Sequence, residues 1–149
     1  MKIKRFLVAL VTLMLPAIFG IQNVSAGSND TNITYQRIDG AYFYIVDNST
    51  GAVDTNHVTK FLMNGKVAFC IEPMTDITTR VYSSTEGLSG SGYSADVIRK
   101  IELYGHYGYD YPGHQTDRYW LATQKLIWES AKNVSVKFTT GANGSGSVI

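Results

Sequence analysis

Apolar residues gather first near the N-terminus, in a stretch without charge at residues 6–21. Three basic residues precede this stretch: Lys2, Lys4 and Arg5. Small residues follow it at Val24-Ser25-Ala26. A basic start, a short apolar segment and a small-residue end are typical of a secretory signal peptide. The stretch is also shorter than the roughly 20 apolar residues that cross a bilayer comfortably. The pattern therefore predicts a cleaved signal peptide at residues 1–26 and an exported mature chain.

Past a flexible polar lead at residues 27–33, apolar residues recur in short segments whose composition favours β-strands. Such segments are predicted at residues 34–38, 41–46, 57–63 and 66–71. Asp39-Gly40 joins the first two segments, and Asn64-Gly65 joins the last two. Both dipeptides favour the two-residue turn of a β-hairpin, so we expect two hairpins.

The hairpin at Asn64-Gly65 predicts the position of the only cysteine. A type I′ turn there pairs Met63 with Lys66 and, in the same register, Thr59 with Cys70. Strand alternation then places the larger apolar side chains of the second strand on one face and Cys70 on the other. We therefore expect the thiol outside the main core, at the approachable end of a strand.

Later in the chain the patterning becomes helical. Ser94 and Thr116 are typical N-cap residues, and they precede predicted helices that reach about Tyr104 and residue 131. Short strands are predicted at residues 78–82 and 134–139. The second helix is apolar around most of its circumference, so we expect it to be buried on nearly all sides.

Strand-rich segments followed by helices predict an α+β fold, an antiparallel β-sheet region with a small helical subdomain. Residues 34–149 are enough for one domain. The last residues form a Gly/Ser-rich turn followed by Val148-Ile149, a pattern typical of the start of another element. We therefore expect a fold that is incomplete at the C-terminus, with residues 34–149 as the N-terminal part of a domain.

Charge and cysteine content narrow the classes of function. The formal net charge is +1, and it becomes slightly negative once the basic residues of the signal peptide are removed. No basic patch favours nucleic acid, and no second apolar stretch favours a membrane span. Exported proteins normally pair their cysteines, but Cys70 stands alone. Its side chain is therefore a reactive thiol, half of an intermolecular bridge, or a buried inert group.

Two short motifs follow one another along the chain. The first is Phe69-Cys70-Ile71-Glu72-Pro73, and the second is ATQKLIWE at residues 122–129, with IELYGHYGY at 101–109 between them. On an exported chain, this order resembles the thioester domains of Gram-positive surface adhesins. That family has an aromatic residue, a cysteine and an apolar residue on a strand, followed by a helix with the pattern TQ-x-A-(I/V)-W. This chain matches the helix at four positions and has Leu126 where alanine is usual; the matches are Thr123, Gln124, Ile127 and Trp128.

The resemblance implies a thioester between Cys70 and a glutamine side chain, which an amine of a host or surface protein, typically a lysine, opens to form an amide. It implies a secreted cell-surface adhesin that is not an enzyme and needs no cofactor. In the family, the bonded glutamine belongs to a third motif downstream, where apolar residues flank it. Gln115 and Gln124 follow Cys70, and neither matches that motif. We therefore expect the partner glutamine beyond the printed chain and no thioester in this chain alone. Gln124, a supporting residue by resemblance, is the alternative partner.

Two other classes of function stay open. The main alternative is a non-covalent extracellular binding module in which Cys70 is inert. A cysteine protease or transpeptidase would pair the thiol with a histidine. His57, His106 and His114 are available, but none lies in a recognisable protease motif. We expect His57 and His114 in loops, as solvated side chains.

The histidines also fit no familiar metal site. A set of Cys70, His106, Asp110 and His114 lacks the ligand spacing of zinc motifs, so no metal is expected. The tyrosines of residues 104–111 either pack a glycine-rich turn or form a carbohydrate- or protein-binding surface.

Overall fold

Five strands and two α-helices make up the part of the chain that the computed structural model describes, residues 30–75, 81–83, 88 and 91–149. The strands are β1 (Asp30–Asp47), β2 (Val53–Met63), β3 (Lys66–Ala68), β4 (Val81–Ser83) and β5 (Val134–Thr139). The helices are α1 (Ala95–Tyr107) and α2 (Asp117–Ala131), and a short 3₁₀ turn, η1 (Ala142–Gly144), follows β5. The predicted signal peptide and residues 78–80 of a predicted strand lie outside the described residues. Residues 30–33, predicted as the end of a flexible lead, already belong to β1.

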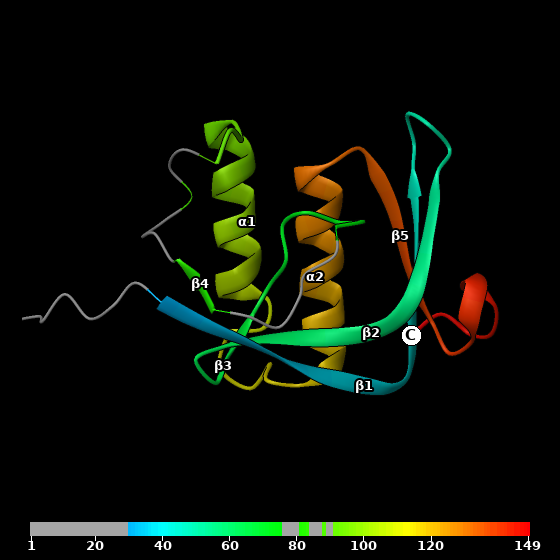
Figure 1. Cartoon of the computed structure of the whole chain (residues 1–149), viewed down its shortest axis with the longest axis horizontal. Coiled ribbons are helices and arrows are strands. Elements are labelled where there is room, and N and C mark those ends of the chain that lie inside the picture. Colours follow the sequence, from blue (N-terminus) through cyan, green and yellow to red (C-terminus); the bar gives the residue numbers. More distant parts are fainter. Residues whose placement is uncertain (1–29, 76–80, 84–87, 89–90) are drawn as a thin grey trace, which may run out of the picture.

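The strands form one antiparallel sheet in the order β3-β2-β1-β4, and β5 pairs with β1. Figure 1 shows β1 and β2 curving together beneath the helices and then rising beside β5. Helix α2 packs against β5, and α1 packs against α2. The predicted α+β class with an antiparallel sheet is confirmed.

Strand β1 contradicts the prediction of a hairpin at Asp39-Gly40. The chain continues through this dipeptide as one strand, with a shift of register against β2 between Arg37 and Tyr42. A type I′ turn needs a positive φ at both central residues, and here only Gly40 has one, at 69°. Ile38 and Ala41 near it are both buried, whereas Gly40 itself is exposed, so the chain passes this point as an irregularity within one strand and does not reverse.

The hairpin between β2 and β3 is confirmed. Asn64 and Gly65 both have positive φ, at 50° and 78°, as a type I′ turn requires. Met63 lies opposite Lys66 as predicted, and the ladder continues to Ala68. It ends there, so the predicted pairing of Thr59 with Cys70 is wrong. The chain leaves the sheet at this point and crosses towards α2.

The helix caps agree with the sequence. The side chains of Ser94 and Thr116 accept hydrogen bonds from the backbone N–H groups of Val97 and Tyr119. Helix α1 extends to Tyr107, one turn beyond the predicted end. Helix α2 has the predicted bounds, but its expected burial on nearly all sides is wrong. One face packs on the sheet, whereas the opposite face is exposed, with Leu126 42% accessible.

The core fills the space between the curved sheet and α2. Buried side chains come from β1, β2, α2 and β5, with Trp120 of α2 almost wholly enclosed. Gly108, which ends α1, lies against Thr123 of α2, so closely that a Cβ atom there would overlap the threonine hydroxyl. Among the described residues, no helix is both long and apolar enough to cross a membrane.

Candidate functional site

Gln124 holds the backbone of Cys70. The Cys70 N–H donates to Gln124 Oε1 over 3.0 Å, and Gln124 Nε2 donates to the Cys70 carbonyl oxygen over 2.7 Å. Gln124 has no exposed surface, so these two bonds satisfy a carboxamide that would otherwise be buried at a high cost. They also replace the strand pairing that was predicted for Cys70. The glutamine side chain takes the place of a neighbouring strand and fixes the cysteine against α2.

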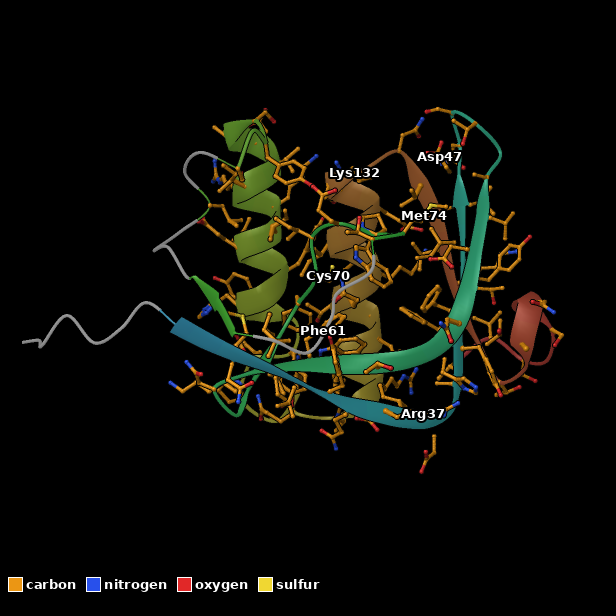
Figure 2. All side chains as sticks on the ribbon, in the orientation of Figure 1. Arg37, Asp47, Phe61, Cys70, Met74 and Lys132 are labelled. Atoms are coloured by element: carbon orange, nitrogen blue, oxygen red, sulfur yellow. The ribbon has the colours of Figure 1, made fainter. Side chains whose placement is uncertain are left out.

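The predicted burial of Cys70 is wrong. It was expected outside the core, yet it is only 9% exposed and belongs to the main apolar cluster. The reason is the departure of the chain from the sheet after Ala68, which turns the thiol inward. Figure 2 shows Cys70 on the loop that crosses α2, above Phe61 of β2.

The environment of the thiol favours its protonated form. Burial raises the pKa of Cys70 above the usual range of a thiol, while a backbone hydrogen bond at Glu72 and the Trp128 side chain partly oppose this shift. The S–H group donates to the Glu72 carbonyl oxygen over 3.2 Å. A nucleophilic role therefore requires that the proton leave within the site, because the thiolate is the reactive species.

A cavity of about 470 Å³ opens beside Cys70, between β1, β2 and α2. Aromatic side chains form much of its wall, and Arg37, Asp54 and Glu72 add charged groups. The size is within the range of pockets that accept small molecules or single side chains. Cys70 thus combines burial with access to a defined space.

Three polar atoms around this cavity lack a hydrogen-bond partner among the described residues. They are Trp120 Nε1, Trp128 Nε1 and His57 Nδ1, all buried. Native proteins leave few buried polar atoms unpaired, so such a group calls for an explanation. His57 was expected in a loop as a solvated side chain. It lies in β2 with a half-buried ring against Tyr42, at a centroid distance of 4.3 Å.

The loop that carries Cys70 is tied to both helices. The Tyr93 hydroxyl, just before α1, donates to a Glu72 carboxylate oxygen, and Lys132 after α2 pairs with the other oxygen at 3.0 Å. Both contacts hold the pKa of Glu72 below its usual range, the Tyr93 hydrogen bond most strongly. The ammonium of Lys132 also lies 5.4 Å from the centre of the Tyr93 ring. These contacts tie the loop to the segments that flank the two helices.

The other motif residues have separate positions. Thr123 lies against Gly108 at the end of α1, which explains why position 108 has no side chain. Ile127 is buried in the body of the domain. Leu126 is 42% exposed and lies outside the cavity wall.

Within the part of the chain that the structure describes, the remaining glutamines do not approach the thiol as acyl donors. Gln115 donates through Nε2 to the carbonyl oxygens of Tyr109 and Tyr111, both over 2.8 Å. Gln36 is exposed and alternates in β1 with Tyr35 and Arg37, which line the cavity, so it lies on the opposite face.

The residues of the proposed metal alternative are not brought together. His106 and His114 belong instead to a series of aromatic contacts in which the rings of His114 and Tyr119 stack at 3.7 Å. His114 lies in a loop as predicted, but it is half-buried, with Nδ1 2.8 Å from the Gly108 carbonyl oxygen, so its expected solvation is wrong. In the described ranges, no group of three or more histidine, cysteine or acidic side chains is placed to hold a metal ion.

Sequence reasoning missed Trp120 and the contacts of Glu72. Trp120, Gln124 and Trp128 are spaced four residues apart in a helix, which places them on one face. From that spacing, the sequence could have predicted that both tryptophans lie on the same helix face as the glutamine. The partners of Glu72 lie 21 and 60 positions further along the chain, at Tyr93 and Lys132, and carry no local signal.

Comparisons with known proteins identify no relative: no protein-family model, no curated protein and no solved structure matches the chain.

Proposed function

We propose that this chain is the cysteine-bearing part of an adhesin-type thioester domain in a secreted Gram-positive surface protein. Cys70 forms a thioester with a glutamine side chain and so stores an acyl group for an amine of a host or surface protein. The observation that supports this proposal most is the pair of hydrogen bonds between Gln124 and the Cys70 backbone. They hold a lone cysteine in one orientation beside a cavity, as acyl chemistry requires.

The chemistry has two steps. The Cys70 thiolate attacks the carbonyl carbon of the glutamine carboxamide, the C–N bond breaks, and the nitrogen takes up protons and leaves as ammonia. An amine then attacks the thioester carbon, the C–S bond breaks, and an amide joins the two proteins while the thiolate is released. Burial supports this scheme because it limits water, which would hydrolyse the thioester before an amine arrives.

The glutamine that reacts is proposed to come from outside the described residues. Both polar atoms of Gln124 are bonded to the backbone of Cys70, and attack on its carboxamide would break both bonds. Gln115 is held by its own loop, and Gln36 lies on the far face of β1. Gln124 therefore has a supporting role in this proposal.

Intact-mass measurement of the protein secreted by its own cells tests the proposal. A thioester lowers the mass by one ammonia relative to the sequence, and methylamine then adds its full mass by opening the bond. Cys70→Ala must show neither the deficit nor the addition. Cys70→Ser is a second control, because it retains a hydroxyl of similar size.

The competing function is a non-covalent extracellular binding module. The raised pKa of Cys70 favours it, since a buried protonated thiol is a poor nucleophile. A secreted protein of full mass, whose thiol titrates freely after denaturation, would support this second function and exclude the thioester.

A further inference from the structure

The indole N–H of Trp128 is a buried donor whose use the fold does not explain. The side chain is only 8% exposed, and Nε1 has no acceptor among the described residues. It borders the same cavity as Cys70 and lies near enough to the sulfur to oppose the rise in the thiol pKa. The Trp128 side chain lowers the thiol pKa as a hydrogen-bond donor does, although its N–H has no acceptor within hydrogen-bond geometry among the described residues. Trp128 and Cys70 thus line one cavity, and the indole N–H has no fixed acceptor in the fold.

Packing holds this indole in one orientation. Phe43 of β1 meets it edge to face at a centroid distance of 6.1 Å, and Phe138 of β5 lies at 6.4 Å. Trp128 also follows Gln124 by one helical turn, on the same face of α2. One turn of the helix thus fixes the backbone of Cys70, and the next places a packed indole in the wall of the cavity that Cys70 also lines.

We propose that Trp128 Nε1–H is the oxyanion donor for acyl transfer to Cys70. When the thiolate attacks an acyl carbon, the carbonyl π electrons move to the oxygen, which becomes negatively charged one bond away from the new C–S bond. The indole N–H donates a hydrogen bond to that oxygen. The charge returns to the carbonyl as the leaving group departs. This inference rests on the proposed acyl chemistry at Cys70 and assigns a catalytic group to it.

Two reagents separate an oxyanion donor from a group that acts on the sulfur. p-Nitrophenyl acetate acylates the thiolate through a tetrahedral oxyanion and releases p-nitrophenolate. Iodoacetamide alkylates the same thiolate by displacement of iodide and forms no oxyanion. Both reactions need the thiolate and access to the cavity. Their rate ratio therefore isolates stabilisation of the acyl oxygen.

The test compares wild type with Trp128→Phe, using Cys70→Ala to subtract background. We expect acylation to fall roughly ten- to a hundredfold while alkylation changes by less than about twofold, since one oxyanion donor is worth up to 10²–10³ in rate. An unchanged alkylation rate also shows that the variant is folded and the cavity open. An equal fall in both rates, or no fall in acylation, would overturn the proposal.

Trp120→Phe is the matched control, because it removes another buried, unpaired indole N–H from the wall of the same cavity. It should change acylation and alkylation by the same factor, so that their ratio stays within about twofold of wild type, as expected for a residue that is not the donor. A selective loss of acylation equal to that of Trp128→Phe would overturn the assignment to Trp128. If wild-type Cys70 is alkylated but never acylated, the proposed function itself fails.

Discussion

Gln124→Met removes both bonds to the Cys70 backbone while keeping the side chain close to its original length. Cys70 lies in the core, so its N–H and carbonyl oxygen would lose their partners in a place that water reaches poorly. A buried backbone group left unpaired costs about 1–3 kcal/mol, which gives about 2–6 kcal/mol for two groups. Burial of the apolar methionine side chain offsets part of this loss, so we expect the free energy of unfolding to fall by about 2–4 kcal/mol.

Urea unfolding followed by tryptophan fluorescence measures this change, because Trp120 and Trp128 are both buried in the native state. Leu126→Met is the matched control. It introduces the same residue two positions away on the exposed face of α2 and should change stability by less than about 0.5 kcal/mol.

The same variants also report on the position of the thiol. Without the bonds from residue 124, the loop around Cys70 loosens, and alkylation by iodoacetamide should become faster in Gln124→Met but not in Leu126→Met. If Gln124→Met unfolds at the same urea concentration as wild type, the two bonds do not hold the cysteine, and the reasoning about the site is refuted.

Two further predictions concern packing and pH. Gly108→Ala should destabilise the domain by about 1–3 kcal/mol in thermal melts, because the new Cβ overlaps the Thr123 hydroxyl. Gly105→Ala, inside α1 with open space around it, should instead raise stability by about 0.5–1 kcal/mol, and a loss in both variants would contradict the packing argument. The alkylation rate of native Cys70 should rise with pH at a midpoint above that of the urea-denatured chain, because burial raises the thiol pKa. By linkage, the free energy of unfolding should fall as pH rises through the ordinary thiol range, and a native midpoint below the denatured one would contradict both statements.

Local chemistry accounts for what the sequence predicted well. Ser94 and Thr116 form caps with the first turns of their own helices, so the start of each helix depends on residues only three positions apart. Asn64-Gly65 forms its turn because both residues can adopt positive φ and the flanking strands pair. Asp39-Gly40 has the same local signal but continues as a strand. Its neighbours Ile38 and Ala41 are buried in a core that distant parts of the chain complete, and a short segment does not reveal this burial.

Contacts between distant parts of the chain explain what the sequence missed at the site. Cys70 was expected to pair with Thr59 in the sheet, but Gln124, 54 positions away, takes both of its backbone groups. The motif resemblance did draw attention to Gln124 and Trp128 together, although it did not predict their contacts. The cavity and the enclosed indole of Trp120 depend on the curvature of β1 and β2, which no local pattern specifies.

Peptide mapping after methylamine treatment of the protein from its native source shows whether Cys70 is joined to a glutamine. We predict one N-methylated glutamine, located outside the described residues, and a Cys70 thiol that becomes free to alkylate only after the treatment. Methylation of Gln124 would contradict its supporting role. A Cys70 thiol that is free before treatment, with no methylated glutamine anywhere, would contradict the thioester itself.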